Sequence, residues 1–120
     1  MNIHSAGILL DMVGDANLQI YQEMNSRRFA PQLIQQFWAT ARRIGIKEFH
    51  AQTRHEVRDD HLPLNEIAKI PTIDIIDFDY PSSRHRETYW HTTEDTVDKC
   101  SAVSLAHVGC VTLAWLQSIQ

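Results

Sequence analysis

Two short apolar segments in different halves of the chain constrain its fold most strongly. "AGILLDMVG" (residues 6–14) is a near-continuous apolar run that only Asp11 interrupts, and "PTIDIIDF" (residues 71–78) has apolar residues at Ile73, Ile75 and Ile76. Short runs of this kind, bounded by glycine or proline, are typical of strands in a parallel sheet. We therefore expect a strand in each segment, and we expect the first to be buried on both faces.

The segment between these strands has the spacing of an amphipathic helix. Its apolar residues recur every three or four positions, Pro31 suits a first helical turn, and Gly45 suits the position after the last one. These features predict a helix over residues 31–44, with a stripe formed by Leu33, Ile34, Phe37, Trp38, Ala41 and Ile44.

The remaining segments complete an alternation of strands and helices. We expect a short strand over residues 47–52, a polar loop over 53–60, a short helix within 61–70 and a largely buried helix over 101–119. Strands that alternate with helices indicate an α/β fold with a mainly parallel sheet flanked by helices. The length of 120 residues fits one domain, residues 1–120.

The composition argues against nucleic-acid and membrane partners, and the spacing of the two cysteines argues against a disulfide. A net charge of −4 argues against a nucleic-acid surface. No apolar run approaches the roughly 20 residues that a membrane span needs, so we expect no membrane partner. Ten positions along one helix would place Cys100 and Cys110 too far apart for a disulfide. Both are predicted to be free thiols packed in the core.

Three places hold side chains that could carry chemistry: Asp11, the pair Asp59–Asp60, and His91. Each also has a purely structural interpretation, as a cap for loop amides, a solvated acid pair or a packed histidine. Ligands bind beyond the carboxyl ends of the strands in such sheets. Asp11 and the loop after Phe78 are therefore expected on the same side of the sheet.

Metal binding is constrained by the number of ligands at hand. "HEVRDDH" resembles a zinc-helix motif, but its histidines are six residues apart, whereas that motif needs them four apart on one helix face. A catalytic zinc usually takes three protein ligands and one open position. Asp11 and His91 supply two at most, so a further ligand would have to come from elsewhere.

Three blocks of the sequence together resemble one family. "GILLDMVG", "DDHLPLNEIAKIPTIDIIDFDYP" and "YWHTTEDT" are similar to the C-terminal half of the catalytic domain in the zinc-dependent aminopeptidase and glutaminyl cyclase superfamily. The resemblance extends from about Ala6 to Leu116, and the blocks follow one another in the order that the family has.

The resemblance implies roles for single residues. Asp11 would bind a second zinc in a two-metal aminopeptidase, and would hydrogen-bond the substrate in a one-zinc cyclase. His91 would be a zinc ligand in both branches. Asp59 would join Asp11 in a hydrogen-bond network, which favours the cyclase branch because aminopeptidases more often carry a serine there. Trp90 would form a wall of the substrate pocket, and Asp60 would contact the substrate.

The family's other active-site groups come before the "LDM" strand, and only five residues precede Ala6 here. They are a histidine, an aspartate and a Glu–Glu pair that includes the acid–base glutamate. We therefore expect the second half of a larger catalytic domain, with zinc weakly bound or absent in this chain alone.

The expected reaction of the complete enzyme is cyclisation of an N-terminal glutamine to pyroglutamate, with release of ammonia, on a peptide or small-peptide substrate. The alternatives are a zinc aminopeptidase and a non-catalytic, self-associating module. We also expect a homo-oligomer or pairing with the absent N-terminal half. The resemblance favours a secreted or periplasmic location.

Overall fold

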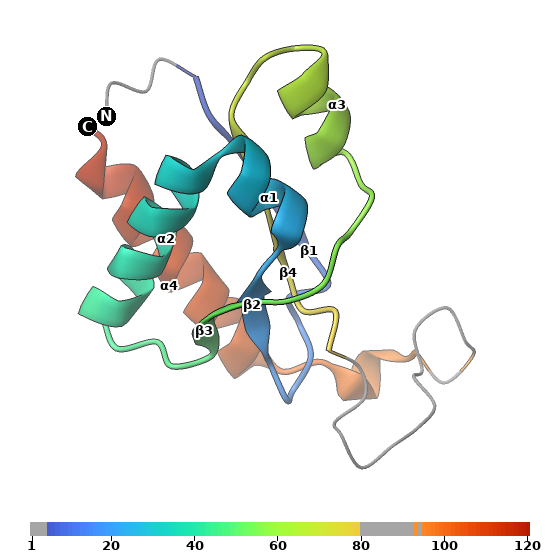
Figure 1. Ribbon diagram of the computed structural model, residues 1–120. Coiled ribbons are helices and arrows are strands. Elements are labelled where there is room, and N and C mark those ends of the chain that lie inside the picture. Colours follow the sequence, from blue (N-terminus) through green and yellow to red (C-terminus); the bar gives the residue numbers. More distant parts are fainter. Residues whose placement is uncertain (1–4, 80–92, 94) are drawn as a thin grey trace.

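The computed structural model describes residues 5–79, 93 and 95–120. Two parallel strand pairs lie at its centre, with helices around them (Figure 1). The strands are β1 (Gly7–Asp11), β2 (Ile20–Gln22), β3 (Phe49–Thr53) and β4 (Thr72–Ile76). The helices are α1 (Met24–Phe29), α2 (Pro31–Arg43), α3 (His61–Glu66) and α4 (Ala102–Ser118), with a 3-10 turn, η1, at Val97–Lys99. The predicted α/β fold with parallel strands is confirmed.

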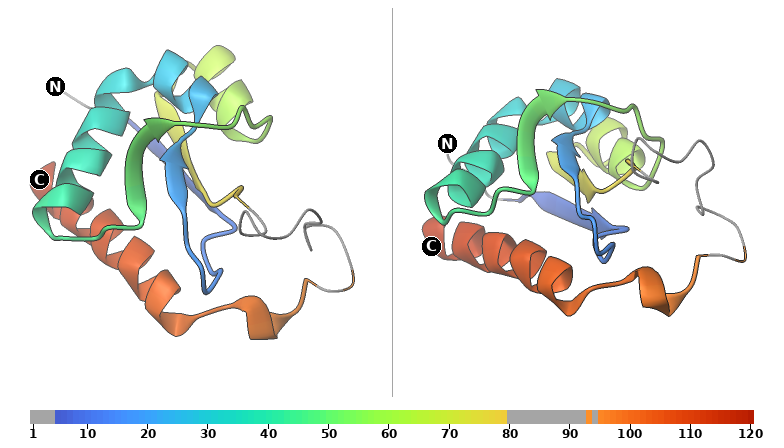
Figure 2. Two further views of the ribbon diagram at one scale, coloured as in Figure 1. Left: turned by 60° about the horizontal axis from the view of Figure 1, so that its bottom comes forward. Right: turned by 90° about the horizontal axis from the view of Figure 1, so that it is seen from below.

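The two faces of β4 serve different parts of the molecule because side chains alternate along a strand. Ile73 and Ile75 join the apolar core with α2 and α4. Asp74 faces α1, where its backbone N–H donates to Ser26 Oγ at 2.8 Å. Figure 2 shows α4 on one side of β1 and β4, and α1 and α3 on the other.

The core is built around Phe37, which is fully buried and lies against the rings of Trp38, Phe49 and Trp115. The helix α2 follows its prediction closely. It begins at Pro31, and Gly45 takes the left-handed φ of 79° that suits the position after a helix. Ile44 was expected in the buried stripe, but it is the C-cap residue and is 37% exposed.

Three further predictions of burial are wrong. β1 is only partly buried, and Leu10 is 44% exposed, because within the described residues β1 pairs with β4 alone. In α4 the buried residues are Ser104, Val108, Val111 and Trp115, because that helix packs against the rest of the chain along one side. Cys100 and Cys110 are free as expected, but both are exposed rather than packed in the core.

Two elements were not predicted: the three-residue strand β2 and the six-residue helix α1. Both are too short to show a period of hydrophobicity. The predicted helix within residues 61–70 is present but ends at Glu66. No helix in the described part of the chain is long and apolar enough to cross a membrane.

Candidate active site

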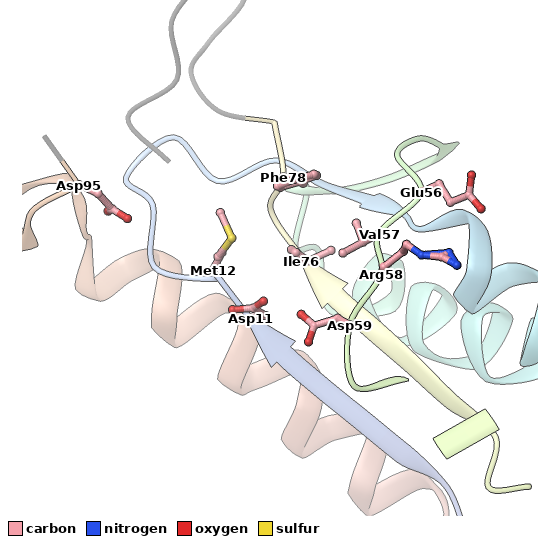
Figure 3. A pocket seen from close by; sticks show the side chains of 9 residues that line it. All are labelled: Asp11, Met12, Glu56, Val57, Arg58, Asp59, Ile76, Phe78 and Asp95. Atoms are coloured by element: carbon pink, nitrogen blue, oxygen red, sulfur yellow. The ribbon is translucent and has the colours of Figure 1, made fainter. Parts of the chain in front are cut away.

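A pocket of about 580 Å³ opens at the carboxyl ends of β1 and β4. Asp11 and Ile76 are paired residues at the ends of these parallel strands, so whatever follows each strand lies at the same edge. Phe78 and Asp11 both line the pocket, so the segment that follows β4 begins at the same edge of the sheet as Asp11. The loop after Phe78 that was expected there lies, beyond Asp79, largely outside the described residues. Figure 3 shows the lining side chains: Asp11, Met12, Glu56, Val57, Arg58, Asp59, Ile76, Phe78 and Asp95.

The carboxyl groups of Asp11 and Asp59 face each other across this pocket (Figure 3). Burial raises the pKa of Asp11, and a hydrogen bond with the Asp59 side chain and the charge of Asp59 raise it further. Two carboxyl groups this close repel each other when both are ionised, so the Asp59 charge favours a proton on Asp11. The pair therefore offers hydrogen-bond acceptors, and a donor wherever Asp11 carries a proton, to one small polar ligand.

The backbone next to Asp11 is strained. Met12 has a φ of 55°, in the left-handed region that side chains with a Cβ rarely adopt. A backbone hydrogen bond from Met12 lowers the pKa of Asp11 and so opposes the effects of burial and of Asp59. Strained residues concentrate at functional sites, which fits the position of Met12 in the pocket wall.

The segment that carries Asp59 is hydrogen-bonded to a buried glutamate, Glu23. Glu23 is the N-cap of α1, and its carboxylate accepts hydrogen bonds from the backbone N–H groups of Asn25 and Ser26, both at 2.8 Å. It also accepts from the Val57 N–H at 3.0 Å and from His61 Nε2 at 2.9 Å. Burial alone would raise the pKa of Glu23, but these hydrogen bonds outweigh it and lower the pKa to about 2.

A second buried acid lies on the far side of His61. Asp74 Oδ2 is 3.8 Å from His61 Nδ1, and both side chains are 0% exposed. Burial raises the pKa of Asp74 to about 7, against the effect of the nearby His61 charge. Burial lowers the pKa of His61, but the hydrogen bond to Glu23 and the surrounding acids raise it overall.

The structure brings together two of the residues that the sequence singled out. Asp11 and Asp59 form the centre of the pocket. Asp60 is exposed and is not among the lining residues, so its contact with substrate stays a prediction. Trp90 and His91 lie outside the described residues. Sequence reasoning did not identify Glu23, Asp74 or Asp95, although Asp74, like Asp11, is an acid within an apolar strand.

A zinc site needs more ligands than this pocket shows. Within residues 5–79, 93 and 95–120, no group of three or more His, Cys, Asp or Glu side chains is placed to hold a metal ion. Of the residues expected to bind zinc, only Asp11 lies among the described residues that line the pocket. The described residues therefore do not form a metal site by themselves.

Comparison with solved structures finds close relatives of this fold. A leucine aminopeptidase precursor from Bacteroides thetaiotaomicron is 37% identical, with a TM-score of 0.83 over 92% of this chain and 36% of its own. Porphyromonas gingivalis glutaminyl cyclase is 34% identical, with a TM-score of 0.86 over 95% of this chain and 40% of its own. A Zn-dependent exopeptidase from Parabacteroides distasonis is 33% identical, with a TM-score of 0.82 over 91% and 38%.

The chain therefore spans well under half the length of each of these solved relatives. Among curated proteins, none matches the chain. The model of peptidase family M28 matches residues 2–116, almost the whole sequence. The predicted resemblance to zinc aminopeptidases and glutaminyl cyclases is confirmed, and the chain belongs to peptidase family M28.

Proposed function

We propose that the protein to which this chain belongs is a glutaminyl cyclase, which converts an N-terminal glutamine of a peptide to pyroglutamate and releases ammonia. One observation carries the proposal: the carboxyl groups of Asp11 and Asp59 lie next to each other in the pocket at the strand ends. A second aspartate at this position is what the resemblance to cyclases implies. The similarity to P. gingivalis glutaminyl cyclase supports it.

The two carboxyl groups match the two polar groups that react in an N-terminal glutamine, its α-amine and its side-chain amide. In the reaction the α-amine nitrogen bonds to the γ-amide carbon, the bond from that carbon to the amide nitrogen breaks, and ammonia leaves with one proton from the amine. An ionised carboxylate accepts a hydrogen bond from the amine, and a protonated one donates to the amide. Holding the two groups in register removes much of the entropic barrier.

Zinc belongs to the proposal only through the resemblance and the relatives. The P. distasonis relative is described as Zn-dependent. In a cyclase with one zinc, the metal would polarise the amide carbonyl as a Lewis acid. His91, which lies outside the described residues, is proposed as a ligand. Asp11 would be a ligand only in the two-zinc aminopeptidase.

The alternative is an aminopeptidase that hydrolyses the bond after an N-terminal residue. The similarity to a leucine aminopeptidase precursor favours it, at 37% identity. The same pocket would serve, since both reactions begin at a free α-amine. The two reactions differ in the bond that breaks: the side-chain amide in the cyclase, and the backbone peptide bond in the aminopeptidase.

Assays with two substrates separate these functions. The full-length protein would be incubated with a peptide that starts with glutamine and with an aminoacyl amide. Release of ammonia from the first, with the peptide bond intact, supports the cyclase. Replacing Asp59 by Asn should then lower kcat/KM by about a hundredfold or more, whereas Glu66→Gln, at an exposed glutamate of α3, should change it little. Peptide-bond cleavage would instead support the aminopeptidase.

We also propose that this chain associates through the exposed apolar side of α4 and the adjacent face of β1. Leu10 on β1 is 44% exposed, and five apolar residues of or just after α4 are between 43% and 62% exposed: Val103, Leu105, Leu113, Leu116 and Ile119. Apolar surface of this extent favours a partner, either a second copy or the part of a larger domain that the relatives contain.

Two further expectations stay predictions. One is that this chain alone is a non-catalytic, self-associating module. The other is a secreted or periplasmic location, which the family resemblance favours. A radiolabelled or tagged protein fractionated between cytoplasm, periplasm and medium would test the location directly.

A further inference from the structure

One buried carboxylate holds the chain on both sides of Asp59. Glu23 Oε2 accepts the Val57 backbone N–H at 3.0 Å, and Glu23 Oε1 accepts from His61 Nε2 at 2.9 Å. These contacts lie two residues before and two residues after Asp59. Glu23 therefore fixes both ends of a five-residue segment whose central side chain reaches Asp11.

Further hydrogen bonds restrain the segment between those two ends. The Asn25 side chain donates to the Val57 carbonyl at 3.2 Å, and the Leu62 N–H donates to the Asp59 carbonyl at 3.0 Å. The Asp59 carboxylate itself accepts from the Asp60 N–H at 2.8 Å. The Asp59 side chain thus comes from a backbone with little freedom to move away from Asp11.

The charges around His61 call for a protonated ring. Glu23, His61 and Asp74 are 1%, 0% and 0% exposed, and within the described part of the chain neither His61 Nδ1 nor either Asp74 carboxylate oxygen has a hydrogen-bond partner. A buried carboxylate without a compensating charge is costly. A proton on Nδ1 gives the ring a positive charge between two carboxylates, with Nδ1 3.8 Å from Asp74 Oδ2.

The acids near this cluster act differently on its two members. Glu23, Asp74 and Asp59, the last from the loop before α3, are charges that act on His61, and each favours an imidazolium over a neutral ring. Glu23, Asp59 and Asp11, the last from the end of β1, act on Asp74 and favour its protonated form, whereas the His61 charge favours its carboxylate.

We infer that Glu23 and His61 are positioning residues that hold Asp59 against Asp11, with His61 charged between Glu23 and Asp74. Neither residue is among those that line the pocket, so both act through the 57–61 segment. The inference rests on the proposed role of Asp59, but its test needs no enzyme activity. Failure of the cyclase assay would leave the test unaffected.

The protonation of His61 is measured first, by ¹⁵N NMR of the labelled protein across pH. At pH 7 both ring nitrogens of His61 should show the shifts of an imidazolium. Replacing Asp74 by Asn should lower the pH of half-titration by about one unit or more, because a neighbouring opposite charge is lost. Asp77→Asn is the matched control: Asp77 is also buried and close in sequence, but it bonds Gln19 and Asp79 instead.

The position of Asp59 is measured second, through the Asp60 amide that donates to it. His61→Gln should shift this resonance and speed its hydrogen exchange, and Asp77→Asn should leave it unchanged. A neutral His61 ring at pH 7, or an Asp60 amide unchanged in His61→Gln, would overturn the inference. If His61→Gln does not fold, the Asp74→Asn titration still decides whether the cluster carries its charge.

Discussion

Glu23 and His61 lie 38 residues apart in the sequence and form a buried ion pair, with His61 Nε2 2.9 Å from Glu23 Oε1. Their contact joins the start of α1 to the start of α3, the two helices that cover one side of β4 (Figure 2). Breaking a buried ion pair by removing one partner is strongly destabilising. The pair is therefore as important for the fold as for the pocket beside it.

Glu23→Gln should reduce the free energy of unfolding by about 3–5 kcal/mol. The Glu23 carboxylate uses both oxygens, one for Asn25 and Val57 and the other for Ser26 and His61. A glutamine has only one acceptor oxygen, so its NH₂ group would meet donors. Urea unfolding followed by circular dichroism measures the change.

The control for that substitution is Glu66→Gln, at an exposed glutamate in α3. It should change the free energy of unfolding by less than about 0.5 kcal/mol. Equal effects of the two substitutions would show that the hydrogen bonds of Glu23 contribute nothing specific.

Stability should depend on pH with a maximum in the acidic range. The pKa of Glu23 falls from 4.5 to about 2 on folding, so its contribution is complete above pH 4.5 and is lost as the pH falls towards 2. Burial raises the pKa of Asp77 from 3.8 to about 7, so the folded state keeps a proton that the unfolded state loses. Stability therefore falls as the pH rises from about 4 to about 7.

Asp77→Asn tests the second half of this profile. The substitution removes the titrating group, so the decline between pH 4 and pH 7 should become shallower. Thermal unfolding across that range measures the slope. A decline as steep as that of the unaltered protein would contradict the assignment.

The close approach of β1 to β4 depends on a glycine. A Cβ at Gly7 would lie 2.5 Å from Thr72 Oγ1 and 2.8 Å from Thr72 Cγ2, and Thr72 is 1% exposed. Gly7→Ala should therefore push the paired strands apart and destabilise the protein by about 1–3 kcal/mol. Gly109→Ala, in the interior of α4 with nothing within 4 Å, should instead stabilise it by about 0.5–1 kcal/mol. Chemical denaturation of both variants gives the comparison.

Local patterns were enough to predict the long elements and the place of Asp11 at the strand ends. The stripe on α2 and the apolar runs of β1 and β4 each depend on residues close together in sequence. The placement of Asp11 beside the segment after β4 follows from parallel pairing alone, because Asp11 and Ile76 end their strands together. The contact of Asp59 with Asp11 came from the family resemblance rather than from any pattern.

Contacts that depend on distant partners could not be predicted. Glu23 looks like an ordinary polar residue in sequence, since its importance comes from Val57 and His61, 34 and 38 residues away. The burial of β1 and α4 was overestimated for a related reason. An apolar sequence indicates which segments are favoured to be buried, but it does not indicate whether the residues that bury them belong to this chain.

That uncovered surface gives the last prediction. Leu113 is 57% exposed, and Leu105 and Leu116 lie on the same side of α4 at helical spacing. A charge placed among them makes their burial against a partner costly, so Leu113→Glu should shift the protein from self-associated species to monomer. Sedimentation velocity over a range of concentrations measures this shift. Gln35→Glu adds the same charge at an exposed polar position of α2 and should leave association unchanged. A monodisperse monomer in the unaltered protein at high concentration would disprove self-association through this surface.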